Sequence, residues 1–352
     1  MKIGLQLNPS RYDVGAMAKA IEDGGMDSAW AMGGLYPVYA QMLLATERID
    51  VGGAIIPLFQ TAPMNHASNG SFLQGVSGGR FIYGMGTQTK GQIRINLGLD
   101  NPKPAKMARE SLEILRAILN RTGDPLRYDG EYFSINLPSG GRFNRRTPDA
   151  NDIAPPPIFF SGVNRLNLRL AGELSDGLVG HPIFPPRYIK EIVWPLVDEG
   201  LSRAGKTRAD FHMTGMGLAW VADNEVDRLE GVRRAKHNLG RWLTTRAYGN
   251  FMESMGFTKE RQAIQAVVNR APYGGPFDDE ALTDAISDEM CEETSMIGTV
   301  EEVIQKAKER YEGLVDTLIL FTIGQEDPLE EDTVINRTQA HRLIDAFESY
   351  PR

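Results

Sequence analysis

The chain has 352 residues, of which 41% are hydrophobic and 24% charged, and its formal net charge is −8. This composition is typical of a globular protein with a large core, and the negative charge argues against a protein that binds nucleic acid or anionic membranes. Cys291 is the only cysteine, which excludes an intrachain disulfide framework. No apolar run approaches the ~18 residues of a membrane span, and the N-terminus lacks the apolar stretch of a signal peptide. We therefore expect a cytoplasmic protein.

Strand-like and helix-like segments alternate from the N-terminus onward. Residues 2–7 are expected to form a strand, and Asp13 can cap a helix whose apolar residues recur at helical spacing from Val14 to Ile21. Seven further strands are expected at 27–32, 50–56, 80–86, 157–161, 176–180, 211–221 and 314–323. The later helices are expected at 38–46, 62–76, 108–119, 165–174, 188–204, 225–251, after a capping box at Thr299–Glu302, and at 339–347.

Eight strand-then-helix units have two common outcomes, a closed parallel barrel or an open doubly wound sheet. The number of strands and the chain length favour a single-domain (β/α)8 TIM barrel over residues 1–352. Two segments do not fit the alternation of strand and helix and are expected to be insertions into the barrel. Residues 127–156 contain an apparent hairpin at Tyr128–Phe133 and then a loop rich in proline, asparagine and arginine, and residues 255–297 are polar and helical.

Two motifs with a possible chemical meaning have plainer explanations. Gly75–Gly79 matches the G-x-S-x-G pattern of serine hydrolases, but a helix precedes it and a strand follows it, the reverse of a nucleophile elbow. The glycines are better explained as a helix C-cap. The five histidines are not paired at ligand spacing, and with one cysteine this argues against a metal site.

Two strand ends are candidates for ligand binding. Residues 84–89 lack the third glycine of a dinucleotide fingerprint, yet a glycine-lined strand end with two hydroxyls and an amide can receive a phosphate at a barrel mouth. We expect Gly86, Thr87 and Gln88 to contribute, together with the segment after the fifth strand: Ser161, Gly162, Val163 and Asn164. His181 follows the strand at 176–180 and should also lie at the mouth, although packing against Pro182 is the alternative.

The order of the motifs resembles that of the bacterial-luciferase-like superfamily of flavin and deazaflavin oxidoreductases. Residues Leu73–Gln88 are similar to its passage L-x-x-x-S-x-G-R-F-x-x-G-x-G through the fourth strand. The further similar stretches are 109–116, 130–133, 156–158, 171–177 and 297–303. Within the superfamily, the chain looks most like the branch that uses the deazaflavin coenzyme F420, on three stretches: Gly86–Gln88 followed by Lys90, His181–Tyr188 and Ile286–Met290.

The resemblance implies an enzyme that binds F420 and moves a hydride between the deazaflavin C5 and a small organic substrate. The alternatives are an FMN-dependent monooxygenase on the same fold, or a flavin-binding protein without catalysis. It also implies a cis peptide behind the ring, which we place at Gly53–Ala54 from the distance to Pro57. Relatives are often dimers through the second and third helices, so we expect a homodimer.

One departure from the family pattern affects the expected chemistry. Relatives commonly have an acidic residue and a histidine just after the second strand, where this chain reads Met32–Pro37 with neither. Tyr36 and His181 are the nearest groups that could donate a proton. The sequence does not identify the substrate.

Overall fold

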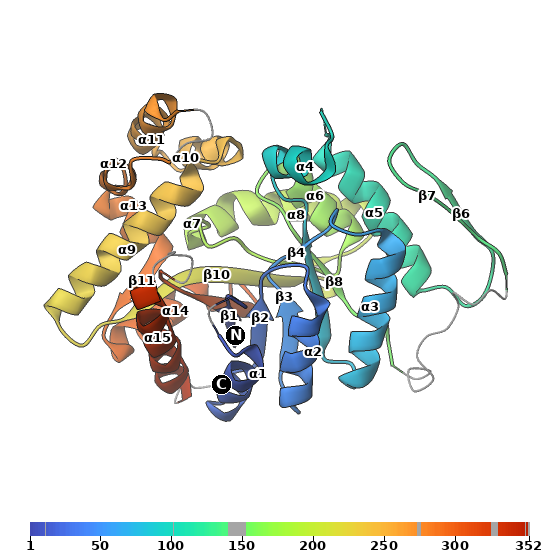
Figure 1. The fold of residues 1–352 in the computed structure, drawn as a ribbon, viewed down its shortest axis with the longest axis horizontal. Helices are drawn as coiled ribbons and strands as arrows, with labels where there is room; N and C mark the ends of the chain where they lie inside the picture. The colour runs from blue at the N-terminus through green and yellow to red at the C-terminus, as the bar shows by residue number, and fades with distance from the viewer. Residues whose placement is uncertain are drawn as a thin grey trace.

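The described residues contain eight parallel strands that close into a barrel in this computed structural model (Figure 1). The structure describes residues 1–10, 12–100, 102–139, 153–272, 276–324, 330–348 and 350. The barrel strands are β1 (Lys2–Leu7), β2 (Ser28–Ala31), β3 (Asp50–Gly53), β5 (Phe81–Gly86), β8 (Ile158–Ser161), β9 (Gly177–Leu178), β10 (His212–Val221) and β12 (Thr317–Thr322). Each pairs with the next in this order, and β12 returns to β1. The predicted barrel is confirmed.

Helices surround the barrel between the strands. They are α1 (Val14–Asp23), α2 (Tyr36–Ala45), α3 (Pro63–Val76), α4 (Lys90–Leu97), α5 (Pro104–Leu119), α6 (Arg165–Leu174), α7 (Pro186–Tyr188), α8 (Trp194–Arg203), α9 (Glu225–Leu243), α14 (Val300–Tyr311) and α15 (Glu330–Glu348). Asp13 caps α1 by accepting the Ala16 N–H, and Thr299 and Glu302 form the predicted capping box of α14.

Large side chains from several strands fill the barrel interior. The Trp30 ring of β2 lies 6.4 Å from the Phe159 ring of β8, which stacks on His212 of β10 at 5.2 Å. The His212 Nε2 atom lies 2.9 Å from the Thr317 hydroxyl on β12. Because alternate residues of a strand share a face, these contacts identify which positions of each strand point inward. Gly52 leaves room for Trp30, since a Cβ there would lie 2.3 Å from the indole.

The same aspartate contact fixes the strand register at three places. Asp27, Asp176 and Asp316 each precede a strand, and each donates its N–H to a residue of the neighbouring strand while its carboxylate accepts that residue's N–H. The partners are Ile3, Ile158 and Met213, and all six distances are between 2.7 and 2.9 Å. The three sites lie at the amino ends of the strands, opposite the barrel mouth.

The first insertion begins with the predicted hairpin, formed by β6 (Leu126–Asp129) and β7 (Ser134–Leu137) beside α5 (Figure 1). The buried Glu110 carboxylate of α5 accepts the N–H groups of Glu131, Tyr132 and Phe133, and this ties the hairpin turn to the barrel. Residues 140–152 of the predicted loop lie outside the described residues.

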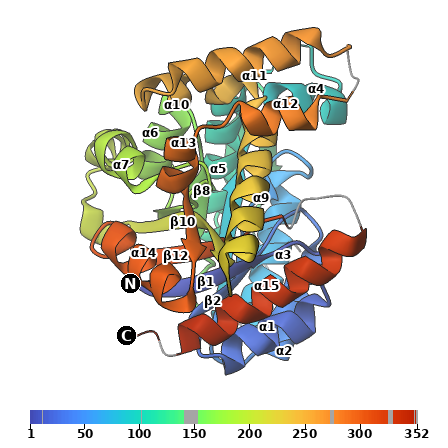
Figure 2. The same cartoon turned by 90° about the vertical axis from the view of Figure 1, so that its left-hand side faces the viewer.

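The second insertion forms a layer of short helices at the end of the molecule where α4 also lies (Figures 1 and 2). The layer begins before the predicted bounds of 255–297, with the single turn η5 (Arg246–Tyr248) and α10 (Gly249–Ser254). It continues with α11 (Thr258–Arg270), α12 (Asp279–Asp284) and α13 (Asp288–Thr294). It ends with β11 (Ser295–Gly298), which pairs with the outer half of β10 and was not predicted.

Several predicted elements differ from the structure for local reasons. The helix predicted at 225–251 ends at Leu243, and a separate turn and α10 follow. The helix predicted at 188–204 contains a π-helical stretch, η3 (Ile189–Val193), just before Pro195, which has no N–H to continue an α-helical ladder. A one-turn 3₁₀ segment, η4 (Arg208–Asp210), precedes β10. The strand predicted at 50–56 is divided into β3 and β4 (Ile56–Pro57).

Membrane-spanning helices and metal-ligand clusters are both absent from the described residues. None of the helices there is both long and apolar enough to cross a bilayer. Nor do three or more histidine, cysteine, aspartate or glutamate side chains in those ranges come together as metal ligands would.

Candidate functional site

The carboxyl ends of β3 and β5 approach each other with glycine backbone on both sides. A Cβ on Gly84 would lie 1.7 Å from the Gly53 carbonyl oxygen, and one on Gly53 would lie 2.6 Å from the Gly84 oxygen. The cis peptide is Ala54–Ile55, so the predicted position at Gly53–Ala54 is wrong by one residue. Close contact between the two strands, rather than a cis bond, accounts for the glycine at position 53.

The two segments expected to bind phosphate lie side by side. Gly86 and Ser161 are direct partners in the β5–β8 ladder, so Thr87–Gln88 and Gly162–Asn164 leave the barrel together. Gln88 has a φ of 61°, a backbone conformation that few residues other than glycine adopt. Asn164 begins α6 by accepting the Asn167 N–H, so the first turn of that helix opens at the same point. Helix N-termini favour anions.

A buried polar atom joins the two segments. Asn167 is 3% exposed, and its amide nitrogen lies 3.4 Å from the Thr87 hydroxyl. Its carbonyl oxygen is buried without a hydrogen-bond partner in the structure. Buried polar atoms normally have partners, so this atom marks a place where a ligand or ordered water belongs. Gly162 packs closely on the start of α6, since a Cβ there would lie 2.4 Å from the Asn167 side chain.

His181 follows the last residue of β9 by three positions, on the mouth side of that strand. Its ring is partly buried, with Phe184, Trp242 and Tyr248 around it at centroid distances of 5.0 to 6.1 Å. The Ile183 N–H points at the Nδ1 atom (3.3 Å), and the Nε2 atom lies 3.0 Å from the Tyr248 hydroxyl. Burial lowers the pKa of His181 to about 3, so the ring is neutral near pH 7.

Tyr36 is the first residue of α2, and its hydroxyl lies between the barrel wall and α3. It contacts the Nδ1 atom of His66 on α3 and lies 2.8 Å from the Tyr83 hydroxyl on β5. Tyr83 points toward α3, since a Cβ on Gly70 of that helix would lie 2.2 Å from its ring. The structure therefore does not bring the Tyr36 hydroxyl together with His181.

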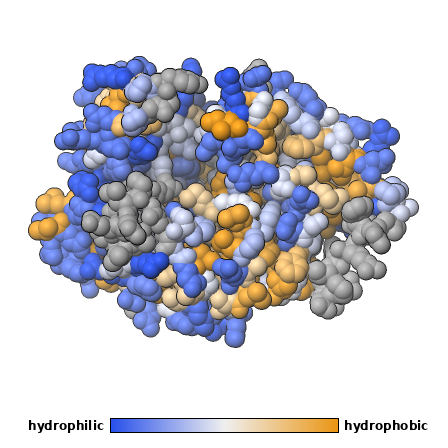
Figure 3. Space-filling model, in the orientation of Figure 1, coloured by the Kyte–Doolittle hydropathy of each residue, from blue (hydrophilic) through white to orange (hydrophobic). Residues whose placement is uncertain are grey.

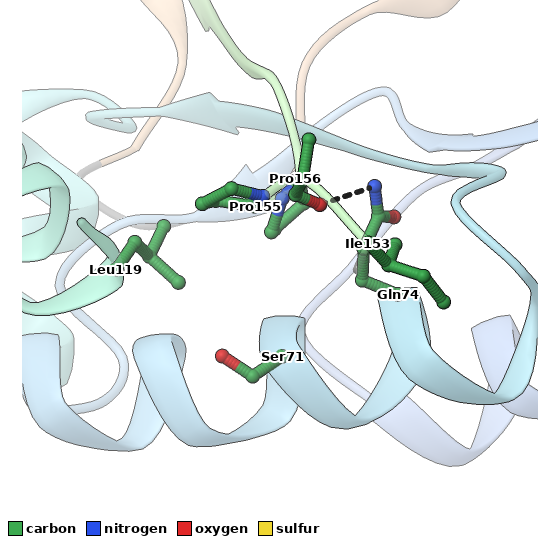
Figure 4. A pocket seen from close by; sticks show the side chains of 7 residues that line it. Ser71, Gln74, Leu119, Ile153, Pro155 and Pro156 are labelled. Carbon is green, nitrogen blue, oxygen red and sulfur yellow. Dashed lines mark hydrogen bonds between the residues drawn. The ribbon is translucent and has the colours of Figure 1, made fainter. Parts of the chain in front are cut away.

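A small cavity near the first insertion is distinct from the barrel mouth (Figure 4). Its volume of about 10 Å³ is enough for one water molecule. The Gln74 amide donates to the Ala154 carbonyl at its edge, which holds the 153–156 segment against α3. The lining residues are Ser71, Gln74, Leu119, Ile153, Ala154, Pro155 and Pro156. The cavity is far too small for a coenzyme.

Asn167 and Tyr248 lie at or beside the candidate site and were not predicted from the sequence. Asn167 looked like an ordinary helix residue, although its place three residues after the capping Asn164 is a usable signal. Tyr248 belongs to an insertion, and the residue that it contacts is 67 positions away in the sequence. No local pattern could predict that contact.

Comparisons with known proteins agree with this geometry. A family model described as luciferase-like monooxygenase matches residues 4–317. The chain is 26% identical over 321 residues to a 5,10-methylenetetrahydromethanopterin reductase of Archaeoglobus fulgidus, covering 88% of this chain and 90% of that protein. It is 28% identical over 173 residues to an F420-dependent glucose-6-phosphate dehydrogenase of Microbacterium testaceum, covering 47% of each. The solved coenzyme F420-dependent tetrahydromethanopterin reductase of Methanopyrus kandleri is 21% identical, with a TM-score of 0.75 over 99% of this chain and 97% of that one.

Proposed function

Because the chain belongs to the luciferase-like monooxygenase family, we propose that it is an oxidoreductase that binds coenzyme F420 at the barrel mouth. It exchanges a hydride with a small organic substrate there. The proposal draws on the relatives named for F420 or for a methanopterin reductase. On the chain itself, it is carried by the junction of Gly86–Gln88 with Ser161–Asn164 around the buried, unpartnered oxygen of Asn167.

The residues at this junction fit a phosphate-bearing coenzyme. The N-terminus of α6 supplies a favourable potential for an anion, and Thr87 and Ser161 offer hydroxyls at the ends of adjacent strands. Packing accounts for Gly86 and Gly162, because a Cβ at either would lie 2.3–2.4 Å from the side chain of Ile55 or Asn167. Gly53 and Ala54, at the end of β3, would lie beside the ring system. The bound deazaflavin supplies a carbon centre that carries the hydride, and the protein supplies its orientation and surroundings.

A binding titration tests the choice of coenzyme. Purified protein would be titrated with F420 and, separately, with FMN, with the fluorescence of each followed. Saturable F420 binding with at least about tenfold lower affinity for FMN, roughly 1.4 kcal/mol, is the expected result. Tighter FMN binding would support the monooxygenase alternative instead. Binding of either without hydride exchange with any tested substrate would support a flavin-binding protein without catalysis.

We also propose that the enzyme is a homodimer through α2 and α3. Hydrophobic side chains gather over these helices on the face shown in Figure 3. Leu44 of α2 is 74% exposed, and Phe72 and Val76 of α3 are 50% and 43% exposed. Contiguous apolar patches of this kind commonly mark protein interfaces. Light scattering should give twice the chain mass, and Phe72→Glu should give the single mass, whereas Leu229→Glu on α9 should leave the dimer intact.

A further inference from the structure

Helix α4 carries positive charge directly beyond one of the proposed phosphate-binding segments. Its eight residues, Lys90–Leu97, include Lys90 and Arg94 but no aspartate or glutamate, although the whole chain has a net charge of −8. The helix is capped by Thr89, which follows Gln88 of that segment, so its first turn lies next to any ligand that the segment holds. Lys90 is therefore the first cation along the chain beyond the proposed phosphate position.

Lys90 and Arg94 lie on one side of α4, because residues four positions apart are neighbours on a helix surface. Both are exposed, and Ile93 is the side chain described as buried that seats the helix on the barrel. In the part of the chain that the structure describes, Lys90 has no ion-pair partner. The Arg94 guanidinium has a solvent-exposed contact with Asp100 at 4.0 Å. The charges of this side of α4 are therefore open to a ligand.

The position of these two charges is unfavourable in the protein alone. The amino end of a helix carries a partial positive charge, which repels a lysine at the first helical position. Like charges four residues apart also repel each other. The first turn of α4 has no acidic residue to offset this, and the capping box of Thr89 and Gln92 satisfies backbone N–H groups without adding negative charge. A bound anion would offset both repulsions.

The two candidate coenzymes differ just beyond the phosphate. FMN ends at its phosphate, whereas F420 continues into a lactyl group and a chain of glutamates that carry free carboxylates. We propose that Lys90 and Arg94 bind the carboxylates of this glutamate tail. The inference rests on the proposed function and names the feature by which the site distinguishes F420 from FMN. The flexible, exposed cations can follow a chain of carboxylates along the helix surface without a preformed cavity.

Helix α6 offers a second direction for the tail, because its first residue, Arg165, is also exposed. That side of the mouth already contains negative charge. The Glu199 carboxylate of α8 pairs with Arg169, and its pKa is lowered mainly by Arg169 and also by Arg165. Helix α4 has two cations and no acid of its own. The charge distribution therefore favours α4 over α6.

Fluorescence titrations at low ionic strength test the proposal with two forms of the coenzyme. One is F420 bearing several glutamates, and the other is the form that ends at the lactyl group. The double change Lys90→Gln, Arg94→Gln should weaken binding of the glutamate-bearing form roughly three- to tenfold, as expected for two exposed ion pairs. Binding of the shorter form should change by less than about twofold. High salt should remove the difference between the two proteins, because exposed charges are screened.

Two control variants separate the tail site from a general effect of charge. Arg203→Gln, Lys308→Gln removes the same charge from the last turns of α8 and α14 and should leave both affinities unchanged. Arg165→Gln should not change the preference for the glutamate-bearing form. Circular dichroism would check that each variant is folded. The unmodified chain gives a test without any variant, because its affinity for the glutamate-bearing form should fall more steeply with salt.

The outcomes distinguish this inference from the proposed function. If the unmodified chain binds neither form of F420, the proposed function is wrong and this inference falls with it. If F420 binds but the double variant keeps its affinity for the glutamate-bearing form, only the inference is wrong. Equal losses for both forms would place Lys90 and Arg94 at the phosphate and also overturn it. A loss confined to the glutamate-bearing form in Arg165→Gln alone would place the tail on α6, which contradicts the inference as well.

Discussion

The Tyr36 hydroxyl oxygen lies 2.8 Å from the Tyr83 hydroxyl oxygen, and both belong to a buried network centred on His66. The His66 Nε2 atom lies 3.0 Å from the Leu58 carbonyl, so it carries the ring proton and Nδ1 accepts from Tyr36. Tyr83 in turn donates to the His66 carbonyl at 2.6 Å. The network joins α2, α3 and β5, and its hydrogen bonds stabilise the fold.

Removing the Tyr36 hydroxyl should therefore affect stability more than chemistry. Tyr36→Phe leaves the buried Nδ1 of His66 without its donor, so we expect a loss of about 1–3 kcal/mol in the free energy of unfolding. F420 affinity and hydride transfer should stay close to those of the unmodified chain. Urea unfolding measures the first quantity, with Tyr128→Phe as the control, because the Tyr128 hydroxyl donates to the half-buried Glu113 at 2.7 Å and not to a group of the His66 network. Lost turnover at unchanged stability would instead support Tyr36 as a proton donor.

Glu22 gives the fold a specific pH dependence. Burial alone would raise its pKa, but the N–H groups of Arg48, Glu47 and Ile49 and the Lys19 ammonium outweigh burial and lower the pKa to about 2. A folded-state pKa below the unfolded value of 4.5 means that the stabilisation is present above pH 4.5 and is lost as the pH falls toward 2. Glu22→Gln should cost on the order of 1–3 kcal/mol at pH 7, and less as the pH falls below 4.5.

The effect of Glu22 is isolated by measuring the free energy of unfolding at a series of pH values from 7 downward. The measurement is made on Glu22→Gln, on a control variant and on the unmodified chain. Glu47→Gln is the matched control, because that side chain is exposed and lies at the loop that Glu22 holds. We expect the free energy of unfolding of Glu22→Gln to lie below that of the unmodified chain at pH 7, with a difference that becomes smaller in acid. Glu47→Gln should show no such difference. If the difference in free energy of unfolding between Glu22→Gln and the unmodified chain did not change with pH, Glu22 would act through packing rather than charge.

The sequence predicted the eight barrel strands because buried parallel strands are short apolar runs bounded by turn residues. It missed α4, where Ile93 is the one side chain that the structure describes as buried. The Thr89–Gln92 capping box was the available signal for that helix. The sequence could predict that Gly86–Gln88 and Ser161–Asn164 lie close together, because the carboxyl ends of barrel strands meet at one face of the barrel. Tyr248 could not be found, since insertion residues reach the mouth through tertiary contacts alone.

Asp27, Asp176 and Asp316 each fix the register between two neighbouring barrel strands through one pair of hydrogen bonds. Asp316 holds β12 against β10 through the Met213 N–H at 2.8 Å, and Asp27 and Asp176 do the same for their strands. We expect Asp316→Ala to lower the free energy of unfolding by about 1–3 kcal/mol, because a buried N–H loses its acceptor. Asp316→Asn keeps an acceptor oxygen and should lose less. Asp50→Ala is the control in thermal unfolding: Asp50 begins β3 but bonds to the exposed Lys2 side chain. Equal losses for Asp316→Ala and Asp50→Ala would contradict this role.

The proposed phosphate-binding segments make the most direct prediction about the coenzyme. The double change Thr87→Ala, Gln88→Ala removes the hydroxyl beside Asn167 and the side chain at the left-handed position, while the backbone of β5 stays in place. F420 affinity should fall roughly ten- to a hundredfold, about 1.4–3 kcal/mol, as measured by fluorescence titration. The control Thr122→Ala, Gln305→Ala makes the same chemical changes at two exposed side chains, one just after α5 and one on α14, outside the ends of β5 and β8, and should leave affinity unchanged. Equal affinities for the two double variants would remove Thr87 and Gln88 from the coenzyme site, and the unpartnered Asn167 oxygen would then need another ligand.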